Sequence, residues 1–155
     1  MQTLSIEPRM TNPAMVTTDV LPALHNVHKA AMKSGLSQEI AYLVHLRASQ
    51  INGCSYCTEM HARELKEFGA SDEKIWAVGA WRESLRFTAA ERAALALTEC
   101  VTRLADRPDP VPDDVFDEAA RYFETEQLSA LLIEIAMINV WNRLNVAVRQ
   151  PSGSD

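Results

Sequence analysis

Three residues of the sequence, Cys54, Cys57 and His61, have the types and the spacing needed for thiol chemistry. They are separated by three and then four positions, and residues three and four apart share one face of an α-helix. Two cysteines at positions i and i+3 in a first helical turn lie near the Cα separation that a disulfide accepts. The pair is therefore expected to cycle between a dithiol and a redox-active disulfide with little backbone movement.

The position of the cysteine pair also favours a reactive thiolate. The N-terminus of a helix carries partial positive charge, and a histidine adds a proton acceptor or a cation, so both lower the pKa of a thiol. His61 lies one turn beyond Cys57 on the same stripe, so Cys57 is expected to be the more strongly activated thiol. Cys54 follows the loop residues Asn52 and Gly53 and is the natural partner for exchange with an external reductant.

A zinc site is the main rival interpretation of a Cys-x-x-Cys motif. Zinc usually takes four ligands, often from two such pairs, and here only His61 and the distant Cys100 could complete the set. We therefore expect no metal. Cys100 falls between Leu97 and Leu104 on an apolar helical face, so it is expected to pack in the core.

The other polar residues on apolar faces are predicted to be structural. Asn139 and Asn142 extend the apolar face of the last helix, and buried amides usually bond to the backbone or to neighbouring helices. The histidines His25, His28 and His45 show no pattern of partners, so no role is assigned to them.

The elements that position these residues are predicted to be helices throughout. Strand-type alternation is almost absent, whereas helical periodicity recurs from about residue 18 to residue 148. Helices are expected to begin after Ser37, Ser71 and Thr88, with a last long helix from about Glu126. The predicted fold is an all-α, single-domain helical bundle over residues 18–150, with an N-terminal extension at residues 1–17 and a frayed tail at residues 151–155.

Composition and charge exclude several classes of partner. The chain has 155 residues and a net charge of −6, and an acidic surface disfavours nucleic acid because phosphate binding needs clustered Lys and Arg. No apolar run approaches the length of a bilayer span, and the first residues have no charged start followed by an apolar stretch. No nucleic acid, no membrane and a cytoplasmic location are expected.

Four segments carry a resemblance to a known family: residues 45–61 (HLRASQINGCSYCTEMH), 80–83 (AWRE), 87–97 (FTAAERAALAL) and 139–144 (NVWNRL). They resemble the alkylhydroperoxidase AhpD-like branch of the carboxymuconolactone decarboxylase family. The likeness covers most of the chain from about residue 39 to residue 146.

The resemblance implies an AhpD-like helical fold, a homotrimer or homohexamer, and antioxidant peroxidase chemistry. It implies no bound cofactor, because the electrons come from an external dithiol, carried by a thiol or lipoyl-type reductant protein. By the same resemblance Cys57 attacks the hydroperoxide substrate, Cys54 resolves the product as a disulfide, and His61 relays the proton.

Two departures from the family pattern affect the proton relay. Members often have a glutamate twelve residues before the first cysteine, where this chain has Tyr42, and the nearest carboxylate is Glu39, one turn earlier. Tyr42 and Glu39 are therefore the candidates for the rest of the relay. Some members also have a histidine between the cysteines, where this chain has Tyr56. A weaker relay predicts slower peroxide turnover.

Three alternatives to a peroxidase remain open. The chain could be a general disulfide oxidoreductase, or a lactone or decarboxylase-type enzyme that uses His61 as a base. It could also be a non-catalytic helical oligomer that senses oxidation through the Cys54–Cys57 disulfide. The decarboxylase branch of the family generally lacks the cysteine pair, which disfavours decarboxylation.

Overall fold

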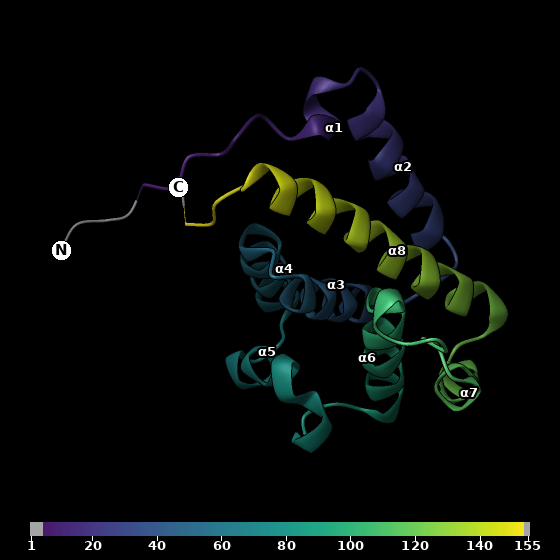
Figure 1. Ribbon diagram of the computed structural model, residues 1–155. Coiled ribbons are helices and arrows are strands. Elements are labelled where there is room, and N and C mark those ends of the chain that lie inside the picture. The colour runs from purple at the N-terminus through teal and green to yellow at the C-terminus, as the bar shows by residue number, and fades with distance from the viewer. Residues whose placement is uncertain (1–4, 154–155) are drawn as a thin grey trace.

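The computed structural model describes residues 5–153, and every regular element in that range is a helix (Figure 1). The α-helices are α1 (Pro13–Val16), α2 (Val20–Met32), α3 (Gln38–Asn52), α4 (Ser55–Phe68), α5 (Asp72–Ala77), α6 (Ala89–Thr102), α7 (Asp113–Tyr122) and α8 (Thr125–Val148). Two 3-10 helices, η1 (Val78–Glu83) and η2 (Leu104–Asp106), connect them. The predicted all-α class is confirmed.

Local sequence signals set most of the helix ends. Thr88 and Glu91 form a reciprocal capping box at the start of α6, and Ser71 accepts a hydrogen bond from a backbone N–H at the start of α5. Gly53 and Gly69 end α3 and α4 with φ values of 65° and 114°, which favour glycine. The α6 helix ends at Thr102, and residues 104–106 continue the chain as η2.

The core lies around α3, which packs against α4, α6 and α8. Leu43, Val44 and Leu46 of α3 are fully buried, and so are Leu131 and Ile135 of α8. In Figure 1, α8 runs across the molecule with α2 along one side and α3, α4 and α6 on the other. The helix that carries the cysteines and the last helix are thereby brought together.

The α8 helix has the length and the composition of a membrane span, with a mean hydropathy of 1.3 in its most apolar window. The expectation that no segment approaches that length is therefore wrong. A central helix of a helical domain passes the same test, and α8 packs against α2, α3 and α6. It also buries the polar residues Glu134, Asn139, Asn142 and Asn145, whose side chains make hydrogen bonds to other parts of the chain.

The predicted N-terminal extension contributes to the packing of the domain. The backbone N–H of Arg9 donates to the carbonyl of Val148 over 2.8 Å, and the Asn12 amide donates to Asn145 Oδ1 over 2.7 Å. Asn12 also caps α1, which lies within the predicted extension. Residues 1–4 of the extension and 154–155 of the predicted frayed tail lie outside the described residues.

Candidate active site

The two cysteines lie at the junction between α3 and α4. Gly53 turns the chain at the end of α3, and Cys54 is the N-cap of α4, so Cys57 falls in the first turn of that helix. The backbone N–H of Cys57 donates to Cys54 Sγ over 3.3 Å. Both thiols are free and buried, with exposed fractions of 2% for Cys54 and 0% for Cys57. Exchange of Cys54 with an external reductant stays a prediction, and in this reduced state the thiol is buried.

The surroundings of the pair make Cys57 the acidic thiol. A hydrogen bond from the Cys54 side chain is the largest cause, and together with the Asn145 and Asn142 amides it outweighs burial and lowers the pKa of Cys57 to about 6. The same interaction and burial raise the pKa of Cys54. At neutral pH the pair therefore holds one thiolate, on Cys57, with the proton kept on Cys54.

Two amides of α8 complete this environment. Asn145 Nδ2 donates to Cys57 Sγ over 3.2 Å, while its oxygen accepts from Asn12, so the amide is held in one orientation. Asn142 acts on both thiols and donates to Ser49 Oγ over 3.0 Å. Asn142 was predicted to be structural and Asn145 was not singled out. Their spacing of three within an apolar helix is the signal that could have found them.

His61 acts on Cys57 electrostatically and makes no hydrogen bond to it. Its Nδ1 pairs with Glu64 Oε2 over 2.7 Å, and its electrostatic effect on Cys57 is the smallest of the causes that lower that pKa. The Nε2 atom is buried and has no hydrogen-bond partner within residues 5–153. That free nitrogen can exchange a proton with a bound molecule.

A second polar group, absent from the sequence prediction, lies beside His61. The His45 ring is centred 4.8 Å from the His61 ring, and His45 Nε2 bonds to Glu134 Oε2 over 2.8 Å. His28 Nδ1 bonds to the same Glu134 oxygen over 2.8 Å. His28 and His45 therefore have a clear partner after all. The signal in the sequence was the single carboxylate within the apolar part of α8.

The structure separates the two residues that were candidates for the relay. Glu39 Oε1 pairs with Lys74 Nζ over 2.7 Å, and Lys74 also holds Glu91, so Glu39 belongs to an ion-pair cluster and is not brought to the cysteines. Tyr42 packs edge-on against Phe68, with ring centroids 6.3 Å apart. Burial, followed by the charge of Glu64, raises the pKa of Tyr42, so its hydroxyl stays protonated.

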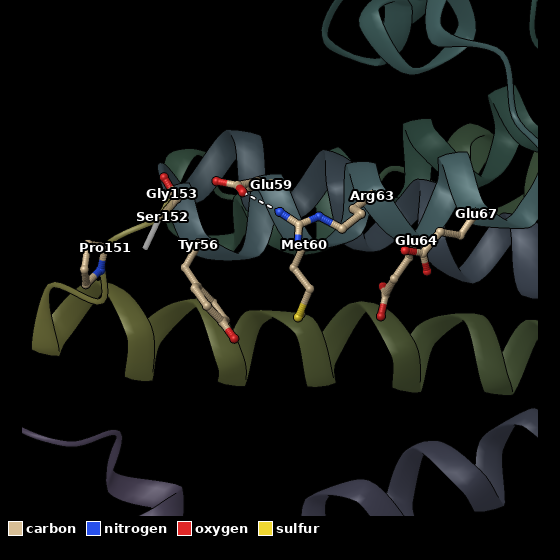
Figure 2. Close-up of a pocket in the computed structure, with 9 residues that line it drawn as sticks. All are labelled: Tyr56, Glu59, Met60, Arg63, Glu64, Glu67, Pro151, Ser152 and Gly153. Atoms are coloured by element: carbon tan, nitrogen blue, oxygen red, sulfur yellow. Dashed lines mark hydrogen bonds and ion pairs between the residues drawn. The ribbon is translucent and has the colours of Figure 1, made fainter. Parts of the chain in front are cut away.

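A cavity of about 540 Å³ opens beside these groups, between α2 and α8. His45, His61, Glu134 and Asn145 line it, together with Tyr42. Figure 2 shows a neighbouring pocket, formed by α4 and residues 151–153, in which Tyr56, Met60 and Glu64 project from α4 toward α8. These three residues also line the cavity between α2 and α8. Glu59 and Arg63, an ion pair at 2.7 Å, lie on the outer side of the same helix.

The third cysteine lies apart from this site. Cys100 is buried on α6 with an exposed fraction of 5%, and its Sγ accepts a hydrogen bond from Arg107 over 3.2 Å. Among residues 5–153 there is no cluster of three or more histidine, cysteine or acidic side chains that could hold a metal ion.

Comparison with known proteins agrees with the fold. Residues 18–99 match the model of the carboxymuconolactone decarboxylase family, so the chain belongs to that family. The uncharacterized protein YdfG of Bacillus subtilis is 27% identical over 90% of this chain and 93% of its own length.

Solved structures define the branch of the family. The crystal structure of ATU0492 from Agrobacterium tumefaciens, a protein of unknown function described as a candidate antioxidant defence protein AhpD, superposes with a TM-score of 0.87. It is 33% identical, over 96% of this chain and 100% of that chain. A variant of the debrominase Bmp8, solved in complex with 2,3,4-tribromopyrrole, shares the fold with a TM-score of 0.78 at 22% identity, over 90% of this chain and 74% of its own. The AhpD-like fold is therefore established for this chain.

Proposed function

We propose that the protein is a cytoplasmic, thiol-dependent peroxidase that reduces organic hydroperoxides through a Cys54–Cys57 dithiol/disulfide cycle. The observation that carries the proposal is the asymmetry of the pair, in which Cys57 has a pKa of about 6 and Cys54 keeps its proton. The thiolate is the nucleophile toward peroxides, and a neighbouring thiol is needed to resolve the product. The AhpD-like fold and the likeness to a candidate antioxidant protein support the same chemistry.

In the first step the Cys57 thiolate attacks the terminal oxygen of the hydroperoxide. The O–O bond breaks, Cys57 becomes a sulfenic acid, and the organic alkoxide leaves. When both of its ring nitrogens carry a proton, His61 can give the alkoxide the proton on Nε2, the atom that has no partner among the described residues, while Nδ1 stays paired with Glu64. The reduction of the disulfide by the dithiol later returns that proton to His61. The product of this step is an alcohol.

In the second step Cys54 attacks the sulfenic sulfur. A disulfide forms, and the leaving hydroxide takes the Cys54 proton and departs as water. An external dithiol then reduces the disulfide, so the sum is hydroperoxide plus dithiol giving alcohol, water and disulfide. A thiol or lipoyl-type reductant protein is the proposed electron donor, because a dithiol on a mobile arm can reach a shielded pair.

The burial of the pair argues against a general disulfide oxidoreductase. With exposed fractions of 2% and 0%, Cys54 and Cys57 offer no surface to the disulfide of a folded protein substrate. A hydroperoxide is small enough to enter the adjacent cavity, which is lined by His61 and Asn145 although neither cysteine is among its lining residues. The peroxidase is therefore the function that the geometry supports best.

The test follows oxidation and turnover separately. Reduced protein mixed with tert-butyl hydroperoxide should lose two thiols per chain in a fast reaction, and dihydrolipoamide should sustain many turnovers. The Cys57→Ser variant is the control and should do neither. Fast oxidation without turnover would indicate an oxidation sensor instead of an enzyme. If the Cys54–Cys57 pair did not react with the hydroperoxide, the proposal would be rejected.

A further inference from the structure

The cavity between α2 and α8 has two chemically different ends. Its apolar wall is formed by Leu21 and Leu24 of α2 and by Met137, Ile138 and Trp141 of α8. Its volume of about 540 Å³ lies within the range of roughly 300–1,000 Å³ that is usual for sites of small organic molecules. An apolar body larger than a peroxide group therefore has room there.

The polar end contains three atoms that lack partners. Within residues 5–153, the buried side-chain atoms without a hydrogen bond are His45 Nδ1, His61 Nε2 and Glu134 Oε1. The exposed fractions of these residues are 8%, 6% and 1%, and all three line this one cavity. Unsatisfied buried polar atoms are rare and costly, so a polar molecule or water that reached these three residues from the cavity would stabilise them.

The charges around these atoms determine whether each one is a hydrogen-bond donor or an acceptor. Glu134 Oε2 accepts hydrogen bonds from both His28 and His45, and despite burial these bonds lower the pKa of Glu134, so the carboxylate is ionised and Oε1 is an acceptor. Burial lowers the pKa of His45, so its ring is neutral. Its proton lies on Nε2, facing Glu134, and Nδ1 is therefore a second acceptor.

His61 completes this end of the cavity. Its Nδ1 faces the Glu64 carboxylate and carries a proton, so Nε2 accepts a hydrogen bond in the neutral ring and donates one after protonation. A hydroxyl or hydroperoxyl group fits part of this set, because it donates its one hydrogen to one of the acceptors and keeps lone pairs for a protonated His61. An ether or a hydrocarbon cannot satisfy the acceptors.

We propose that this cavity is the binding site for an amphipathic organic molecule, with a ring-sized apolar body against Leu24 and Trp141 and a hydrogen-bond-donating head against His45, His61 and Glu134. Under the proposed function, on which this part rests, the molecule is a bulky hydroperoxide of the aryl-alkyl type. His61 lines the cavity and acts electrostatically on Cys57, so the head lies beside the histidine that influences the thiolate. Glu134 and His28 are positioning residues that fix the tautomer of His45.

The first test measures ligand binding without any reaction. Cumyl alcohol, its methyl ether and cumene share one apolar body, and only the alcohol carries a donating head. The alcohol should saturate one site on the reduced protein and shift the indole N–H signal of Trp141, assigned by its loss in Trp141→Phe. We expect the alcohol to bind at least about tenfold more tightly than the ether or the hydrocarbon. Equal binding of alcohol and ether would overturn the assignment of the head, and no saturable binding would overturn the site.

The second test fills the cavity from α2. Leu24→Trp places a larger side chain in the apolar wall, whereas Val27→Trp adds the same side chain on the same helix at an exposed position outside the cavity. Leu24→Trp should weaken cumyl alcohol binding at least about tenfold. It should also lower the ratio of the Cys57 oxidation rates with cumene hydroperoxide and with hydrogen peroxide. Val27→Trp should change neither, and equal effects of the two variants would contradict the location of the site.

The outcomes separate this inference from the proposed function. If the alcohol binds as expected but no hydroperoxide oxidises Cys57, the binding site stands and the peroxidase proposal fails. If Cys57 reacts equally fast with cumene hydroperoxide and hydrogen peroxide and the alcohol does not bind, the reaction stands and the binding site is rejected.

Discussion

Asn145 donates a hydrogen bond to the Sγ of Cys57 over 3.2 Å, although the two residues are 88 positions apart in the chain. Charge-assisted hydrogen bonds of this kind favour the thiolate form and thereby lower the pKa of a thiol. The acidity of Cys57 is therefore a property of the α4–α8 contact as well as of the Cys-x-x-Cys motif.

Replacing Asn145 should make Cys57 less acidic. Asn145→Ala removes the donor, and the loss of one hydrogen bond to a charged group should raise the pKa of Cys57 by about one unit. The ultraviolet absorbance of the thiolate, followed against pH, measures the change. Thr98→Val, which removes a buried hydroxyl on α6 outside the site, is the control for general loosening of the core. A rise of the same size in both variants would show that the Asn145 bond has no specific effect.

The rate of thiol modification should depend on pH in a way that reports the Cys57 thiolate. Because the pKa of Cys57 is lowered to about 6, the rate of alkylation by iodoacetamide should rise through that pH and be nearly flat above neutrality. An ordinary cysteine would reach half its maximal rate near pH 8.5, at roughly its unperturbed pKa. Half-maximal reaction at that higher pH would contradict the assignment.

The same lowered pKa has a consequence for stability. A group whose pKa is lower in the folded state adds stability above its unfolded pKa and loses it as the pH falls through the folded value. The difference in unfolding free energy between the wild type and Cys57→Ser should therefore grow from about pH 6 to roughly pH 8.5. Urea unfolding of the reduced proteins measures this difference in unfolding free energy. A difference that shrank as the pH rose through this range would contradict the lowered pKa of Cys57.

Cys57 should attack the peroxide, and Cys54 should resolve the product as a disulfide. Cys57→Ser should abolish fast oxidation by peroxide. Cys54→Ser should leave the first oxidation intact but trap Cys57 as a sulfenic acid, because no thiol is left to resolve it. Mass spectrometry after a brief peroxide pulse distinguishes the products, and sulfenic acid on Cys54 at the wild-type rate in Cys57→Ser would reverse the roles.

A matched pair of Cys54 variants isolates the hydrogen bond to Cys57. A serine at this position keeps a donor, whereas Cys54→Ala removes it, and this bond is the largest cause of the low pKa of Cys57. The pKa of Cys57 should therefore rise clearly in Cys54→Ala and much less in Cys54→Ser. Equal values in the two variants would assign the low pKa to the other groups around Cys57.

Cys100 should have no part in the redox cycle. It is buried on α6, where Arg107 donates to its sulfur. Cys100→Ser should cost about 1 kcal/mol of unfolding free energy or somewhat more, because a hydroxyl replaces a thiol in a mostly apolar setting. The rate of peroxide-driven oxidation should be unchanged in stopped-flow experiments. A large loss of rate in a folded variant would place Cys100 in the relay.

The chain is expected to assemble as a homotrimer or homohexamer. Trp76 of α5 and Leu85 after η1 are 75% and 102% exposed, so large apolar side chains are available for a subunit interface. Light scattering at micromolar concentration should give a multiple of the 17.3 kDa chain mass, and Trp76→Glu combined with Leu85→Glu should reduce it. A wild-type monomer would refute the assembly.

The sequence predicts the helices and the cysteine motif well because both depend on short-range patterns. The capping box at Thr88, the turn at Gly53 and the spacing of Cys54, Cys57 and His61 are all local features. The partners of the thiol could not be predicted in this way. Asn145 and Glu134 reach the site only because α8 folds back against α3 and α4, and a tertiary contact of that kind leaves no periodic signal in the sequence.

The proton relay illustrates the same limit. The family pattern favours Tyr42 and Glu39, because Tyr42 holds the position where members often have a glutamate and Glu39 lies one turn earlier. The ion pair with Lys74 draws Glu39 elsewhere. Two other carboxylates do lie beside histidines of the site: Glu64 of α4 pairs with His61, and Glu134 of α8 pairs with His45.

The hydrogen bond from Asn12 to Asn145 has a consequence for how relatives are compared. Both residues lie outside positions 18–99, the region by which the chain is matched to its family, yet together they orient the amide that bonds to Cys57. Chains with an identical Cys-x-x-Cys segment can therefore differ in thiol acidity if their first residues or last helix differ. A comparison of the shared segment groups proteins by ancestry. To rank the same proteins by the reactivity of their thiols, the residues at both ends of the chain must also be compared.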